Sequence, residues 1–413
     1  MHTFLVQQYP QIAEEIRKTI SKLQPGLSAT ALANQAKVLR AFSQQNVASH
    51  NLQGSTGYGY NDEGREKLEA IFSQIFGGEA ALVRPQIASG THALWLALAG
   101  NVGPGEEIVS ITGKPYATLD TVVKQKGPGT LDSLNIKFRS LDLLPDGAFN
   151  LNGLAKTLTS KTQIIYIQKS RGYSLRHPVS TEQIGKFATW LKNNYPNPPA
   201  VVVDNCYGEF VETKEPCHGG ADLTVGSLIK NPGGGLAETG GYMVGRQELV
   251  DNVADRLLAP GLHGEIGATG TYLSRMYQGL FLAPHFVGQA VYNARYAALL
   301  AEQLGFKTFP RWDQPRFDLV QAIELGSEDN MDKFCQGIQA ASPVDSFVAP
   351  VPGEVPGYQT PVIMAAGTFI QGASLELTAD GPVEAPYIVY YQGGLGAEHG
   401  LLAITHALAK IFS

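Results

Sequence analysis

The feature that most constrains the fold is a regular alternation of short apolar runs and helical segments between residues 80 and 228. Six runs have the composition of buried strands: Ala80 to Val83, Glu107 to Ile111, Ile136 to Ser140, Gln163 to Gln168, Ala200 to Asp204 and Leu223 to Leu228. Helices are predicted between them: Gly90 to Gly100, Tyr116 to Lys124, Leu151 to Leu158 and Thr181 to Tyr195. This alternation is typical of a mostly parallel sheet covered on both faces. The chain is therefore predicted to be an α/β protein.

Two further regions flank this alternation. Residues 1 to 53 are predicted to form a helical module or arm, with helices at Gln11 to Leu23 and at Ser28 to Gln45, the second capped by a serine. A smaller unit follows with these predicted elements: a helix at Val287 to Leu304, strands near Phe317 to Ile323 and Phe369 to Leu377, and a helix at Glu398 to Ile411. We therefore expect an N-terminal arm at 1–53, a large domain at 54–285 and a small C-terminal domain at 286–413.

The composition excludes several classes of protein. With 44% hydrophobic and 16% charged residues and a net charge of -6, the chain has no basic stripe for nucleic acid. No apolar run approaches the roughly 20 residues needed to span a bilayer, and the first 23 residues lack the apolar core of a signal peptide. The three cysteines show no metal-binding or disulfide spacing. We expect a cytoplasmic protein with no metal and with neither nucleic acid nor membrane as a partner.

Lys230 and Asp204 are the residues on which a functional hypothesis depends. Lys230 lies between an apolar run and the glycines of 233–235, so its amine is predicted to end a strand and to project into a cleft. On spacing alone, an exposed loop lysine is equally consistent. Asp204 ends a buried strand, and ligands of α/β sheets bind beyond the carboxyl ends of strands. The pair matches an aspartate that faces a pyridinium nitrogen and a lysine that binds pyridoxal phosphate covalently.

A predicted phosphate site precedes this pair in the chain. Ser89, Gly90 and Thr91 follow a strand and open a helix, where free backbone amides bind phosphate. The alternative is an ordinary capped turn, and the presence of Asp204 and Lys230 favours the phosphate site. Ser227 is predicted to add a hydroxyl. The glycines near the lysine lack the following Gly-Lys-Ser/Thr of a nucleotide loop, which excludes that motif.

Seven sequence blocks resemble the pyridoxal-phosphate enzymes of fold type I, and more closely the aluminium-resistance or cystathionine β-lyase-like family. In chain order these blocks are Gly57 to Asp62, Val83 to Ala93, Thr112 to Tyr116, Gln168 to Ser174, Val203 to Glu209, Ser227 to Gly241 and Tyr391 to Leu395. The resemblance implies a mostly parallel seven-stranded sheet sandwiched by helices, plus a smaller C-terminal α+β domain. It also implies pyridoxal 5'-phosphate as the cofactor and a homodimer or homotetramer with a shared active site.

The resemblance implies roles for three tyrosines. Tyr116, at the start of a helix, is expected to stack on the cofactor ring and to take part in catalysis, although an ordinary packing role is the alternative. Tyr58 and Tyr60 are expected to reach the cofactor or substrate of the neighbouring subunit, with a glycine-rich loop of exposed aromatics as the alternative. Arg65 is a weaker candidate, because its helix is expected to present charges to water.

Recognition of the substrate carboxylate is the point at which this chain departs from the family. Family members carry Arg-Glu-Pro-Tyr where this chain has Glu384-Ala385-Pro386-Tyr387. Arg171 follows the strand Gln163 to Gln168, so its guanidinium is expected to bind the substrate carboxylate or the cofactor phosphate near the crevice, unless it is a surface cation.

The resemblance implies a carbon–sulfur lyase that acts on a sulfur-containing amino acid by β- or γ-elimination. Lys230 is the expected base for the α-proton, and Asp204 is expected to keep the pyridine nitrogen protonated. An aminotransferase, or a pyridoxal-phosphate-binding protein without efficient turnover, would use the same residues.

Overall fold

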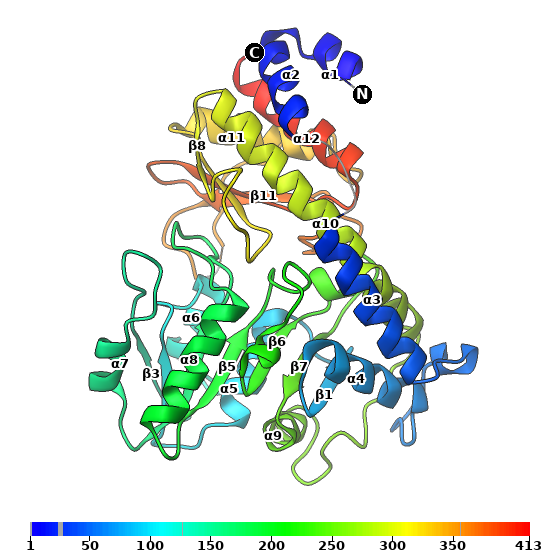
Figure 1. The fold of residues 1–413 in the computed structure, drawn as a ribbon, viewed down its shortest axis with the longest axis vertical. Helices are drawn as coiled ribbons and strands as arrows, with labels where there is room; N and C mark the ends of the chain where they lie inside the picture. Colours follow the sequence, from blue (N-terminus) through cyan, green and yellow to red (C-terminus); the bar gives the residue numbers. More distant parts are fainter. Residues whose placement is uncertain (1, 24–27, 126, 356) are drawn as a thin grey trace.

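The computed structural model describes residues 2–23, 28–125, 127–355 and 357–413. Two sheets organise the chain, a larger one in the lower part of Figure 1 and a smaller one above it, and both termini lie in the upper part. The long helix α10 (Leu273–Gln303) crosses residue 285 and connects the two units. The predicted boundary between residues 285 and 286 therefore falls inside one continuous helix. The three domain ranges stay predictions.

The large sheet has seven strands, as the family resemblance implied. They are β1 (Ala80–Arg84), β2 (Glu107–Ser110), β3 (Lys137–Ser140), β4 (Thr162–Gln168), β5 (Ala200–Asp204), β6 (Leu223–Ser227) and β7 (Gly241–Gly245), in the order β1-β7-β6-β5-β4-β2-β3. Five neighbouring strands of this sheet, β6, β5, β4, β2 and β3, are parallel to one another. Strand β7 is antiparallel to both β6 and β1. The prediction of a mostly parallel sheet is confirmed.

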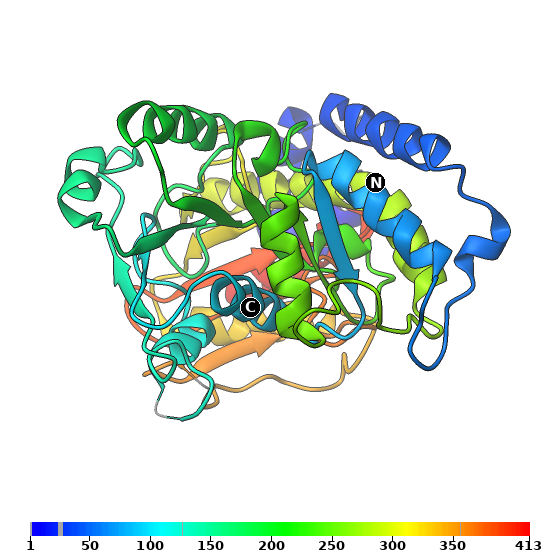
Figure 2. The same ribbon diagram turned by 90° about the horizontal axis from the view of Figure 1, so that it is seen from below.

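Helices cover both faces of this sheet, as Figure 2 shows. They are α4 (Glu63–Phe76), α5 (Gly90–Gly100), α6 (Ala117–Lys124), α7 (Leu151–Thr157), α8 (Thr181–Asn194) and α9 (Gln247–Leu257). Alternate residues of β5 point to opposite faces: Val202 packs in the core formed with α5, α6 and α9, whereas Val201 and Val203 pack in the core formed with α7 and α8. The unbroken valine run is thus explained by burial on both faces.

The small sheet is antiparallel and has five strands. They are β8 (Lys307–Phe309), β9 (Gln321–Glu324), β10 (Val362–Ala365), β11 (Thr378–Pro382) and β12 (Ile388–Gln392), in the order β10-β11-β12-β9-β8. Residues of α10, α11 (Glu328–Ala340) and α12 (Ala397–Ile411) share one core with it. The smaller C-terminal α+β unit that the resemblance implied is present.

Three predicted elements of this unit are wrong in extent or type. The strand predicted near Phe317 to Ile323 is β9, which begins only at Gln321. The helix predicted to begin at Val287 begins at Leu273, because its first turns bury apolar side chains in the core that includes α4. The strand predicted at Phe369 to Leu377 is a turn, in which the Glu376 carboxylate accepts the N–H groups of Phe369 and Ile370. Those two amides are therefore not available for strand pairing, and β11 starts at Thr378.

The N-terminal helices pack on their own chain. Helices α1 (His2–Gln8) and α2 (Ala13–Lys22) contribute Leu5, Ile16 and Ile20 to the core of the small unit. Helix α3 (Ala29–Gln44) lies along α10 (Figure 1). Residues 1 and 24–27 of the predicted arm lie outside the described residues. None of the helices in the described part of the chain combines the length and apolar character required to cross a membrane.

Candidate active site

The carboxyl ends of β4, β5 and β6 and the N-terminus of α5 meet at a pocket of about 280 Å³ between the two units. Seven residues predicted from the sequence line it: Ser89, Gly90, Thr91, Tyr116, Asp204, Ser227 and Lys230. They come from four separate segments of the large unit: the start of α5, the start of α6, the end of β5, and the end of β6 with the residues after it. We refer to this cavity as the lysine pocket.

Lys230 lies just after β6, beyond Leu228 and Ile229, and immediately precedes a short 3-10 turn. Its Nζ lies 4.0 Å from the centre of the Tyr207 ring. Burial lowers the pKa of this amine, but the surrounding acidic groups outweigh burial and the net pKa is raised. A Cβ atom added to Gly90 would lie 3.9 Å from the Lys230 Nζ and 3.4 Å from the Ser227 Cβ. Glycine at position 90 thus leaves open the space that the amine and the serine share.

The N-terminus of α5 forms an anion cradle. The Ser89 side chain caps the helix by accepting the His92 N–H at 3.0 Å. The N–H groups of Gly90 and Thr91 belong to the first turn, where a helix supplies no acceptor, and the helix dipole favours negative charge there. The buried Ser227 Oγ has no hydrogen-bond partner within the described residues. These donors point to a phosphate or another anion as the ligand.

Asp204 is buried at the base of the pocket. One carboxylate oxygen accepts the Cys206 N–H at 3.0 Å and the other accepts the Tyr166 hydroxyl at 3.3 Å. Burial raises the pKa of Asp204, and the Lys230 ammonium opposes that shift. Because burial disfavours the bare carboxylate, a cation bound beside Asp204 would be strongly stabilised.

Tyr116 is the N-cap residue of α6, and its hydroxyl lies 3.1 Å from the Thr91 Oγ1. Burial raises the pKa of this phenol far above its usual range, so the hydroxyl stays protonated at neutral pH. The ring therefore borders the same space as the anion cradle.

Sequence reasoning missed several residues of the pocket: Gln168, Tyr173, Tyr207, Tyr358, Asp380 and Gln392. Four of them fall inside blocks that carry the family resemblance, which could have indicated them. Tyr207 also has a positive φ of 70°, a rare conformation for a tyrosine that places its ring over Lys230. Tyr358 and Asp380 lie outside any recognised block.

Tyr58 and Tyr60 do not line the lysine pocket of their own chain. They are 74% and 56% exposed on the loop before α4. The expectation that Arg65 faces water is wrong. Arg65 is buried and donates to the carbonyl oxygens of Gly59 at 2.7 Å and Gly267 at 3.0 Å, so its charge holds this loop in place.

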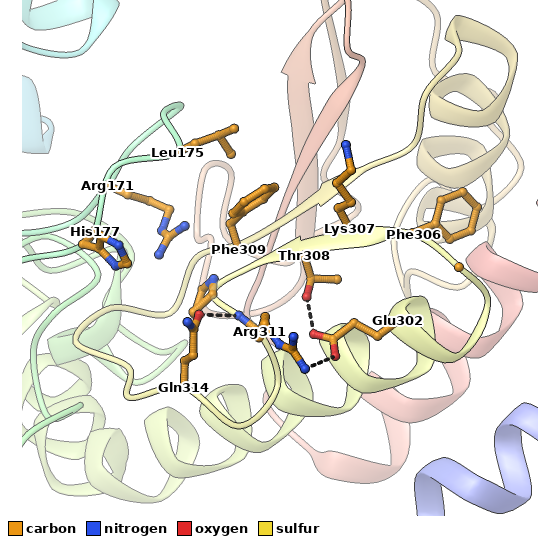
Figure 3. Close-up of a pocket in the computed structure, with 12 residues that line it drawn as sticks. Arg171, Leu175, His177, Glu302, Phe306, Lys307, Thr308, Phe309, Arg311 and Gln314 are labelled. Atoms are coloured by element: carbon orange, nitrogen blue, oxygen red, sulfur yellow. Dashed lines mark hydrogen bonds and ion pairs between the residues drawn. The ribbon is translucent and has the colours of Figure 1, made fainter. Parts of the chain in front are cut away.

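Arg171 lies outside the lysine pocket. It is buried rather than a surface cation, and its Nε lies 3.9 Å from an Asp318 carboxylate oxygen. Figure 3 shows its guanidinium directed into a separate cavity that His177 and Phe309 also line. A further cavity, which Arg171 lines too, shares four residues with the lysine pocket: Tyr116, Gln168, Tyr173 and Tyr358. Arg171 is thus near the pocket without entering it.

The described residues contain no group of three or more histidine, cysteine, aspartate or glutamate side chains that could hold a metal ion.

The chain is similar to several known proteins over nearly its whole length. YnbB from Bacillus subtilis is 46% identical over 97% of this chain and 95% of its own length. A solved structure of a Listeria monocytogenes protein described as involved in aluminum resistance is 47% identical, with a TM-score of 0.91 and full coverage of both chains. A carbon-sulfur lyase involved in aluminum resistance from Clostridium novyi NT gives a TM-score of 0.93 at 40% identity, covering 99% of this chain and 98% of that one.

The sequence resemblance and the fold assignment are both confirmed. The fold is that of the pyridoxal-phosphate-dependent lyases of fold type I. A family model described as methionine gamma-lyase matches residues 9–412, and the chain therefore belongs to the methionine gamma-lyase family.

Proposed function

We propose that the protein is a carbon–sulfur lyase that uses pyridoxal 5'-phosphate to cleave a sulfur-containing amino acid by β- or γ-elimination. Family membership supports carbon–sulfur cleavage in general. The observation that carries the proposal is the meeting of Lys230, Asp204 and the anion cradle of α5 in one pocket.

The residues present fit the cofactor. The amides of Gly90 and Thr91 and the unpartnered Ser227 Oγ would hold its phosphate. Asp204, buried and open to stabilisation by a cation, would face its ring nitrogen, and the Tyr116 ring would pack against the pyridine. Lys230 would bind it covalently. When bound, the cofactor supplies an electron sink for the negative charge formed at the substrate α-carbon.

The protein's own groups then handle protons and orientation. The Lys230 amine would be the base that takes the α-proton. The bond from sulfur to the β- or γ-carbon breaks, and the sulfur leaves with the bonding electron pair and a proton as a thiol. Water then completes the reaction, so that substrate and water give a keto acid, ammonia and a thiol. The hydroxyl of Tyr116, held protonated, would donate a hydrogen bond to the leaving sulfur.

Two further groups complete the proposed site. Tyr58 and Tyr60 are proposed to reach the site of a neighbouring subunit in a homodimer or homotetramer, which accounts for exposed aromatics on a loop that Arg65 holds in place. Arg171 is proposed to attract the substrate carboxylate through the cavity that shares Gln168 and Tyr173 with the lysine pocket.

The direct test is product formation. The cofactor-loaded protein is incubated with L-cystathionine, L-cysteine and L-methionine, and the keto acid and the thiol are measured together. We expect equal amounts of both products from at least one substrate. If no substrate yields keto acid, but an added keto acid acceptor allows amino-group transfer, the protein is an aminotransferase instead.

A further inference from the structure

The wall of the lysine pocket that the small sheet supplies differs in chemistry from the rest of the site. Asp380 on β11 and Gln392 on β12 both line the pocket. In the antiparallel pairing of these strands, Thr378 is opposite Gln392 and Asp380 is opposite Tyr390. Because side chains alternate along a strand, these four residues share one face of the sheet.

Three acceptor atoms on this face are buried and have no hydrogen-bond partner in the described part of the chain: Asp380 Oδ1, Gln392 Oε1 and Thr378 Oγ1. Asp380 is 9% exposed and Gln392 is 4% exposed. A buried carboxylate oxygen without a donor costs free energy, so a ligand that donates at this position is favoured. The atoms proposed to hold the cofactor all belong to the large unit, and they leave the small-sheet wall free.

The charge of the pocket selects the kind of donor. Lys230 is the one cation among the residues that line it. Burial raises the pKa of Asp380 to about 6, and the Tyr173 hydroxyl and the Lys230 ammonium both favour its charged form. If Lys230 held the cofactor covalently, its ammonium would no longer balance the charge of Asp380, and a cation on the substrate would take that place. A carboxylate and an amide oxygen then face the bound substrate, and an ammonium group, which has three donors and no acceptor, is their natural partner.

We propose that Asp380 and Gln392 bind a second ammonium group of the substrate, at the end that carries the leaving sulfur. The enzyme would therefore prefer sulfur amino acids whose leaving thiol bears a positive charge. This inference rests on the proposed lyase function, because it places the reacting amine of the same substrate at Lys230. The substrate carboxylate is repelled by Asp380 and turns toward the side on which Arg171 and Arg176 lie.

A matched pair of substrates tests the proposal. S-(2-aminoethyl)-L-cysteine and S-propyl-L-cysteine have side chains of equal length and differ in an ammonium in place of a methyl. With the cofactor-loaded enzyme we expect kcat/KM to be about tenfold or more higher for the charged substrate, the effect of one charge-assisted hydrogen bond. In Asp380→Asn this ratio should fall to near one, mainly through loss of the charged substrate. Asp146→Asn, on an exposed loop, should keep the original ratio.

Binding without turnover provides a second readout. L-lysine and L-2-aminoheptanoate form the same pair without a leaving group, and calorimetry gives their dissociation constants. We expect lysine to bind about tenfold more tightly, and Asp380→Asn to remove the difference. If Asp380→Asn does not fold, Gln392→Met takes its place as the test variant. This change removes the amide oxygen at similar volume and should weaken the preference for lysine.

The outcomes separate this inference from the proposed function. A ratio near one in the unaltered enzyme, or a preference that survives Asp380→Asn, overturns the inference even if both substrates are cleaved. If lysine binds more tightly than 2-aminoheptanoate but no substrate yields keto acid, the ammonium site is supported and the lyase activity is contradicted.

Discussion

The two walls of the lysine pocket differ in what they offer a ligand. The large unit presents free amides, the Ser227 hydroxyl and the Lys230 amine, which suit an anionic cofactor with a reactive carbonyl. The small sheet presents Asp380 and Gln392, which accept hydrogen bonds and suit a cation. Under the proposed function, the large-unit wall would hold the cofactor and the small-sheet wall would hold the variable part of the substrate. Variants of the two walls should therefore have separable effects.

The largest effect is expected for Lys230→Ala. Loss of the amine removes both the covalent attachment and the base, so kcat/KM for elimination should fall by at least about 10³-fold. Steady-state assays of keto acid release measure it. Lys186→Ala, on the exposed surface of α8, serves as the control and should retain full activity. Retained turnover in Lys230→Ala would contradict the proposal that the pocket wall from the large unit binds the cofactor.

Ser227→Ala tests the cofactor wall with a smaller change. One charge-assisted hydrogen bond to phosphate is lost, so the cofactor dissociation constant should rise by about tenfold. Fluorescence titration of the cofactor-free protein measures it, with Ser133→Ala on an exposed loop as the control. The preference between charged and neutral substrates should stay unchanged. A shift in that preference would mean that the two walls do not act separately.

A neighbouring subunit is proposed as a third contributor to the pocket, beside its two walls. Tyr58→Ala and Lys230→Ala impair different sites if Tyr58 acts across a two-fold interface. Mixing and reassembling the two inactive proteins should restore about a quarter of full activity, since half of the dimers are mixed and each has one intact site. Absence of rescue, with subunit exchange demonstrated by mass spectrometry, would place Tyr58 outside the site.

The smallest effect concerns stability behind the cofactor wall. Burial raises the pKa of Glu209 to about 8, and its carboxylate accepts the Tyr242 hydroxyl at 2.9 Å. Because the folded-state pKa lies above the unfolded value of 4.5, the folded protein binds more protons between these values. The stabilisation that protonated Glu209 contributes is full below pH 4.5 and is lost as the pH rises toward 8. The free energy of unfolding should therefore fall by at most about 1.4 kcal/mol per pH unit in this range.

Glu209→Gln should flatten this decline in the free energy of unfolding, measured by urea denaturation at several pH values. Exposed Glu182→Gln is the control and should keep the decline. An unchanged slope in Glu209→Gln would show that Glu209 stays ionised in the folded protein.

The fold was predictable where local patterns decide it. The valine run before Asp204 and the alternation of strands and helices gave the parallel sheet, because burial on both faces requires apolar residues at every position. Strand β7 (Gly241–Gly245) has no such run, since two of its five residues are glycine. The turn at Phe369 was predicted to be a strand, because composition does not reveal that the carboxylate of Glu376, seven residues later, accepts the Phe369 N–H.

The site was predictable on the cofactor wall for a related reason. Ser89, Gly90 and Lys230 lie at the ends of local elements, where a sequence pattern marks the end of a strand or the start of a helix. Asp380 lies within β11, and its position opposite Lys230 depends on how the small sheet packs over the large unit. Arg65 was predicted wrongly because its helix pattern indicated exposure. Its guanidinium is buried and donates to three carbonyl oxygens, two of which belong to residues far away in the sequence.

The central claim is that Lys230 binds pyridoxal phosphate covalently in this pocket. The protein is loaded with the cofactor, reduced with sodium borohydride, digested and mapped by mass spectrometry. We predict one pyridoxyl modification, on the peptide that contains Lys230 and on no other lysine. A modification at a different lysine, or none in a protein that retains the cofactor, would contradict the account.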